Sequence, residues 1–167
     1  MTTERDDLLA ALGQARHFLR HTTRDLSDEQ ARTRTTASRL TLGGLVKHVT
    51  DVEERWARFM QGLPGGPSGA GDPTSVASYE QGFTMGPDET LKGLLETYAE
   101  VAVRTDAAIA ALPDLDIAYP LPPAPWFPPG AAWSARRVIL HVTAETAQHA
   151  GHADIIRVSL DGALSMG

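Results

Sequence analysis

Apolar residues recur along this chain at the three- and four-residue spacing of amphipathic helices. No segment alternates apolar and polar residues as a half-buried strand does. The pattern predicts four long helices, at about Thr3–Thr23, Leu42–Gln61, Pro87–Leu112 and Ser134–Leu160. Four long helices without strands indicate an all-α fold, a four-helix bundle.

Local signals indicate where these helices begin and end. Thr41 and Ser134 suit the N-cap positions of the second and fourth helices, and Pro87 suits the first turn of the third. Pro113 stops the third helix, and Asp161–Gly162 ends the fourth.

The connections between the helices are unusually long. Asp25–Leu40 is polar and is expected to form a loop with one short helical turn. Leu63–Gly86 is rich in Gly, Pro and Ser and is expected to cross between two helices, with a turn of helix near Ser75–Gln81. Leu115–Trp133 is dense in proline and is predicted to be extended or turn-like. A length of 167 residues without a linker predicts one domain, residues 1–167.

The fourth helix carries polar residues where aliphatic ones are expected. At about 100° per residue, Glu145, His149 and His152 fall within roughly 40° of Val138, and His141 lies about 60° away. Burial of such groups costs several kcal/mol unless something satisfies them. A divalent metal does so most simply, because Glu145 and His149 are four residues apart and point the same way. An internal ion pair of Glu145 with a histidine or an arginine is the alternative without a metal.

Other histidines compete for the same role. His17 and His21 are also four residues apart, but they lie opposite the apolar stripe of the first helix and are predicted to face solvent. His48 lies at the edge of the apolar arc of the second helix, where it either reaches the interior or forms a boundary contact.

Composition narrows the class of protein. A formal charge of −6 argues against nucleic-acid binding, and no apolar run is long enough to span a membrane. The charged N-terminus lacks a signal peptide, so a cytoplasmic location is expected. The chain has no cysteine, so a metal must be held by His and carboxylate, and any thiol must come from outside.

Two further groups of residues have open roles. Three aromatic residues either cap the core or form one wall of a pocket: Trp126, Phe127 and Trp133. Three arginines either are solvated or meet an anionic substrate: Arg55, Arg136 and Arg137.

Two motifs resemble the DinB-like superfamily: TLGGLVKHV at Thr41–Val49 and ETAQHAGHAD at Glu145–Asp154. They resemble the actinobacterial branch long described as a domain of unknown function. That branch is related to mycothiol-dependent maleylpyruvate isomerase and to the bacterial thiol S-transferases. The resemblance implies a helical bundle that holds a divalent metal, zinc first, with nickel, manganese or iron also compatible with the donor set. It also admits a homodimer, because such bundles often dimerise through helix faces.

Carried over position by position, the resemblance implies that His48, Glu145 and His149 bind the metal, in the Glu-xxx-His pattern of the isomerase-like members. Geometry alone also allows His141 with Glu145, or His149 with His152. Two histidines and one carboxylate leave coordination positions open, as in catalytic sites. His141 and His152, one turn on either side, are expected to orient a ligand or act as general bases, and either can replace a ligand.

The function expected from these residues is metal-dependent transfer of a low-molecular-weight thiol, of the mycothiol type, to a small electrophile. The metal would lower the pKa of the thiol. A non-catalytic metal-binding stress or detoxification protein and a metallohydrolase remain as alternatives.

Overall fold

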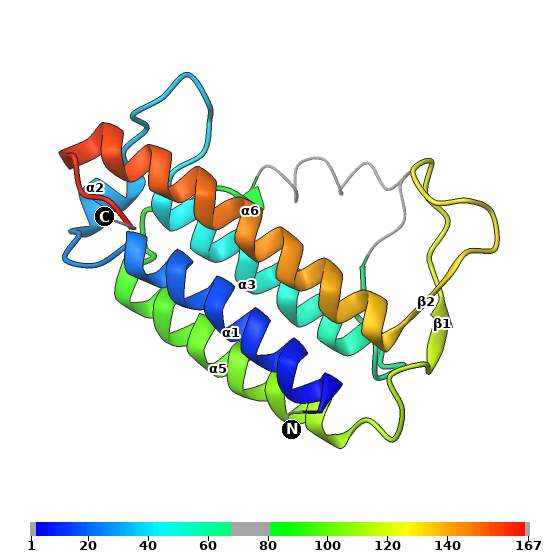
Figure 1. Ribbon diagram of the computed structural model, residues 1–167. Helices are drawn as coiled ribbons and strands as arrows, with labels where there is room; N and C mark the ends of the chain where they lie inside the picture. The colour runs from blue at the N-terminus through cyan, green and yellow to red at the C-terminus, as the bar shows by residue number, and fades with distance from the viewer. Residues whose placement is uncertain (1–2, 68–80, 166–167) are drawn as a thin grey trace.

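The computed structural model describes residues 3–67 and 81–165. Four long helices lie side by side (Figure 1): α1 (Glu4–Thr22), α3 (Leu42–Phe59), α5 (Leu91–Ala111) and α6 (Ala135–Asp161). The short α2 (Asp28–Arg32) packs against α3, and a hairpin of β1 (Ala118–Pro120) and β2 (Ala132–Ser134) lies beside the first turn of α6. The all-α prediction is confirmed. In the part of the chain that the structure describes, no helix is long and apolar enough to cross a membrane.

The predicted caps form as expected. The Thr41 side chain accepts a hydrogen bond from the Gly44 backbone N–H, and Ser134 accepts one from Arg137. Gly162 ends α6 in the left-handed conformation, with φ 80°, which glycine adopts without a steric cost. The short helical turn expected after Asp25 is α2. The turn expected near Ser75–Gln81 falls, except for Gln81, outside the described residues.

The start predicted for the third helix was wrong. α5 begins at Leu91, and Thr90 rather than Pro87 provides the cap by accepting from the Gly93 N–H. Arg32 donates to the carbonyl oxygens of Gly86, Pro87 and Glu89, which holds these residues in a separate turn. A contact from α2 therefore delays the helix that proline would otherwise start.

The core consists of two main apolar clusters along the bundle. One lies near the hairpin and includes Leu12, Met60, Ile109 and Ile139; the other lies toward α2 and is built by Leu19, Leu42, Leu45, Val49, Tyr98, Ala153 and Ile156. α6 contributes to both because it packs against α1 and α3. Its central turns therefore lie at the junction of the two clusters, next to α3.

The proline-dense connection is extended, as predicted, and its two ends also pair as β-strands. β1 and β2 are antiparallel, with Tyr119 opposite Trp133. Phe127 and Trp133 pack against the core as the capping interpretation requires, whereas Trp126 is 65% exposed. The three aromatic residues therefore divide between the two predicted roles.

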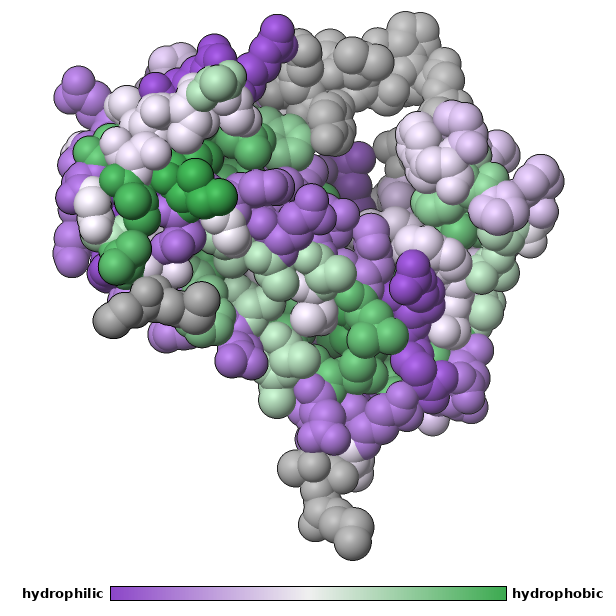
Figure 2. All heavy atoms as spheres, turned by 45° about the horizontal axis from the view of Figure 1, so that its top comes forward, coloured by the Kyte–Doolittle hydropathy of each residue, from purple (hydrophilic) through white to green (hydrophobic). Residues whose placement is uncertain are grey.

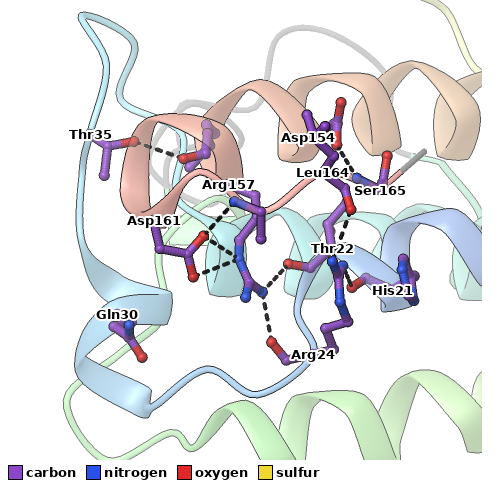
Figure 3. Close-up of polar contacts among 12 residues, drawn as sticks. His21, Thr22, Arg24, Gln30, Thr35, Asp154, Arg157, Asp161, Leu164 and Ser165 are labelled. Atoms are coloured by element: carbon purple, nitrogen blue, oxygen red, sulfur yellow. Dashed lines mark hydrogen bonds and ion pairs between the residues drawn. The ribbon is translucent and has the colours of Figure 1, made fainter. Parts of the chain in front are cut away.

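Arg157 joins the end of α6 to the end of α1 (Figure 3). Its guanidinium donates to the Asp161 carboxylate at 2.8 Å and to the Thr22 and Arg24 carbonyl oxygens at 2.8 and 2.7 Å. A buried guanidinium with all these acceptors fixes the relative position of the two helices.

The outer face of α6 is partly apolar. Leu140, Ile155 and Val158 are all exposed on this helix. Figure 2 shows this side of the molecule, with green apolar patches interrupted by purple polar residues.

Candidate metal centre

His48 from α3 meets Glu145 and His149 from α6. Each offers one ligand-type atom, and these atoms all lie within 4.8 Å of one another. The rings of His48 and His149 are 4.8 Å apart between centroids, and His149 Nε2 lies 3.6 Å from a Glu145 carboxylate oxygen. Among the described residues, no other group of three such side chains converges in this way. This is the set that the resemblance implied.

The depth of these residues differs from the helical-wheel prediction. His149 is buried at 9% exposure, but Glu145, His141 and His152 are only partly buried. The buried side chains near them are Thr146, Ala150 and Ala153. The predicted polar stripe therefore lies along the edge of the core, because α6 faces both α1 and α3, and it borders a cavity.

Electrostatics favour the metal-binding form of the ligands. Burial, and then the neighbouring His149, lower the pKa of His48 to about 4, so its imidazole is neutral near pH 7. The interaction with His149 lowers the pKa of Glu145, which is therefore a carboxylate. A neutral imidazole and a carboxylate are the protonation states that metal ions require.

Phe83, from the connection before α5, packs against the His48 ring. The two rings stack with centroids 3.7 Å apart and planes 18° apart, and Phe83 also lies 5.8 Å from the His149 ring. The close approach of the Phe83 backbone to α3 depends on Gly44, since a Cβ atom there would lie 1.9 Å from the Phe83 carbonyl oxygen. This role was not predicted, although Phe83 is one of the few large apolar residues of its connection.

A cavity of about 420 Å³ opens beside the ligand set. The described residues that line it are His48, Val52, Trp56, Trp126, His141, Glu145, Gln148 and His149. Its lining combines two tryptophans, Trp56 and Trp126, with the three converging side chains. Its volume is in the range of small-molecule sites.

The two flanking histidines take different positions. His141 lies edge-on to Trp56 and Trp133, at 4.8 and 5.1 Å between centroids, and burial lowers its pKa. His152 lies on the other side, with its Nδ1 3.3 Å from the Nδ1 of His149. Neither belongs to the converging group, so the pairings of His141 with Glu145 and of His149 with His152 do not supply three ligands.

The competing candidates lie elsewhere. His17 and His21 stack on α1 at 5.8 Å between centroids, with His17 exposed, and they belong to no converging group in the described residues. The three arginines do not line the cavity: Arg55 pairs with Asp51, Arg136 with Glu4 and Asp116, and Arg137 lies over the Trp133 ring.

The donor set fits a divalent cation. Two imidazoles and a carboxylate come from two different helices and point to one region, and no lysine or arginine lines the cavity among the described residues. Such a set suits Zn²⁺, Ni²⁺, Mn²⁺ or Fe²⁺ and leaves positions for other ligands.

Comparison with known proteins places the chain in a family. The sequence model of the family described as mycothiol S-transferase matches residues 7–162. No curated protein matches the chain. The crystal structure of a conserved protein from Enterococcus faecalis superposes with a TM-score of 0.67 at 11% sequence identity, covering 98% of this chain and 100% of the other; at that identity the similarity shows the fold alone. The family match extends over nearly the whole chain and includes the helices that carry His48, Glu145 and His149, so the chain belongs to the mycothiol S-transferase family, part of the DinB-like superfamily.

Proposed function

We propose that this protein is a metal-dependent S-transferase that joins a low-molecular-weight thiol, of the mycothiol type, to a small electrophile. The observation that carries the proposal is the convergence of His48, Glu145 and His149 at a cavity in a chain of this family. Zinc is the metal we propose first, because a two-histidine, one-carboxylate set with open positions is typical of catalytic zinc. When bound, the cation acts as a Lewis acid that lowers the pKa of the thiol.

The residues around the ligands have distinct roles in this proposal. His141 lines the cavity, and its lowered pKa keeps the imidazole neutral near pH 7. An unprotonated ring nitrogen can therefore accept the thiol proton as a general base. The thiolate sulfur then forms a bond to the electrophilic carbon, and the leaving group departs with the electron pair of the broken bond.

His152 is proposed to orient His149. When the Nδ1–H of His149 donates to the Nδ1 of His152, the Nε2 that faces Glu145 is left unprotonated. In that tautomer the Nε2 of His149 would be free to bind a metal.

The experiment is a conjugation assay. Zinc-loaded protein is incubated with mycothiol and other small thiols, each with a panel of electrophiles, and thioether products are measured by mass spectrometry. We expect conjugate with wild type and a loss of at least about 100-fold with His149→Ala, because catalysis then lacks its cation. Absence of conjugate with every thiol contradicts the proposal, and metal-dependent ester or amide hydrolysis would favour the hydrolase instead. A homodimer remains a prediction that size-exclusion chromatography with light scattering can test.

A further inference from the structure

Trp126 lines the cavity but has no role in holding the metal, so its position there needs another reason. It is 65% exposed, yet it lines the cavity together with His48 and Glu145. Leaving a large indole in water forgoes the stabilisation that burial would give it. A large aromatic side chain exposed at the mouth of a cavity is typical of a surface that contacts a ligand.

The hairpin connection holds Trp126 in this position. The Phe127 backbone N–H donates to the Ala124 carbonyl oxygen at 3.0 Å, which closes a turn around the tryptophan. The Phe127 ring packs against Trp133 at 5.5 Å between centroids, and Trp133 stacks on Trp56 at 4.9 Å. Phe127 therefore anchors the turn to the core, while the neighbouring Trp126 is left to face the cavity.

Other residues of the cavity lining also favour an apolar, flat occupant. Val52 and Trp56 of α3 contribute aliphatic and aromatic surface to the cavity.

We infer that the electrophile is a planar aromatic molecule that stacks on Trp126; this rests on the S-transferase function proposed above. Its reactive carbon lies toward the ligand set, because the aromatic wall and His48, Glu145 and His149 border the same cavity. With a benzylic halide as the electrophile, the thiol sulfur forms a bond to the benzylic carbon, the carbon–halogen bond breaks, and the halide leaves with the electron pair. The thiol proton passes to His141 or to solvent.

Binding without turnover is tested first. Zinc-loaded protein is titrated with 4-nitrotoluene and with its saturated, non-planar counterpart nitrocyclohexane, by calorimetry, in wild type and in the variants Trp126→Ala, Trp126→Leu and Trp126→Phe. We expect 4-nitrotoluene to bind wild type about 3- to 10-fold more tightly than nitrocyclohexane. Trp126→Ala should weaken its binding about 3- to 10-fold, and Trp126→Phe should restore most of the loss.

Three results overturn the inference. They are equal binding of 4-nitrotoluene by wild type and Trp126→Ala, binding of nitrocyclohexane as tight as that of 4-nitrotoluene, and full rescue by Trp126→Leu, which is apolar but not planar. Circular dichroism and zinc content of each variant show that the fold and the metal are retained.

Turnover separates this inference from the proposed function. With mycothiol as the thiol, the ratio of kcat/KM for benzyl chloride to that for allyl chloride should fall about 3- to 10-fold in Trp126→Ala, mainly through KM. An unchanged ratio contradicts the inference while leaving the S-transferase function in place. If no thioether forms but 4-nitrotoluene binds as described, the function is wrong and the aromatic site remains.

Discussion

Two polar clusters interrupt the helical interior, and they differ in how their charges are matched. In the first, Arg16 donates to both Glu53 oxygens at 3.1 and 2.6 Å and to Asp106 at 2.8 Å. Glu53 is fully buried, and Arg16 is 7% exposed. The cluster carries its own cation, so it needs nothing from outside.

The second cluster has acceptors without such a cation. Glu145 and His149 approach to 3.6 Å, His48 completes the group, and no arginine or lysine lines the adjoining cavity among the described residues. The first cluster lies between packed helices, whereas the second opens to a cavity. The comparison indicates that the first cluster is structural and that the second is arranged for an added cation.

The largest effect is expected from unbalancing the first cluster. Glu53→Leu leaves Arg16 with only the partly exposed Asp106, and it should lower the free energy of unfolding by about 3–5 kcal/mol. The double variant Arg16→Met/Glu53→Leu should recover most of that loss, since no unmatched buried charge remains. Glu145→Leu in metal-free protein should cost less than about 1 kcal/mol.

Urea unfolding of the metal-free proteins measures all three changes. A double variant no more stable than Glu53→Leu, or a loss for Glu145→Leu as large as that for Glu53→Leu, would remove the distinction between the clusters.

The next effect concerns the contact that holds His48. Gly44→Ala places a Cβ against the Phe83 carbonyl oxygen and should displace the ring that stacks on His48. We expect zinc affinity to fall about 10- to 100-fold, as for other groups that orient a ligand. Gly13→Ala, where a Cβ meets nothing within 4 Å, should leave zinc affinity unchanged. Competition with a chelating indicator measures both, and an unaltered affinity in Gly44→Ala would show that Phe83 does not position His48.

A smaller loss of zinc affinity is expected when His152 is replaced. His152→Phe removes the ring nitrogen that lies 3.3 Å from His149 Nδ1 and should weaken zinc binding about 10-fold. His152→Asn, which can still accept a hydrogen bond, should restore part of the affinity. The same competition assay serves here; His152→Phe with wild-type affinity would assign His152 to packing alone.

The smallest effect is the pH dependence of the metal-free protein. The folded-state pKa of His48 is lowered to about 4 from 6.5. The unfolded chain therefore binds a proton at pH 5 that the folded chain does not. This contribution to stability is present above about pH 6.5 and is lost as the pH falls toward 4. Allowing for partial exposure, we expect on the order of 1 kcal/mol. Urea unfolding at pH 7 and pH 4.5 should show a steeper fall in wild type than in His48→Gln, and parallel falls would contradict this.

The helices were predictable because their signals are local. Thr41, Ser134 and Gly162 cap helices through atoms within a few residues of themselves. The start of α5 was not predictable in this way, because Arg32 of another element holds the turn that precedes it. The proline-dense connection was recognised as extended, but its pairing depends on the register between Tyr119 and Trp133.

The candidate site was predictable in part for the same reason. The four-residue spacing of Glu145 and His149 places both on one face of a helix. Which earlier helix lies opposite is a property of packing, so His48 came from the family resemblance rather than from periodicity. The matched pair of Arg16 and Glu53 joins two helices far apart in sequence, and no local pattern indicates it.

The most direct test of the account is the metal content of the purified protein. Elemental analysis after zinc loading and desalting should give about one zinc per chain for wild type and for His17→Ala, whose histidine belongs to no converging group in the described residues. It should give almost none for His149→Ala, because the remaining two side chains cannot retain the ion. Zinc in His149→Ala comparable to that in wild type would contradict the assignment of His48, Glu145 and His149 as the metal ligands.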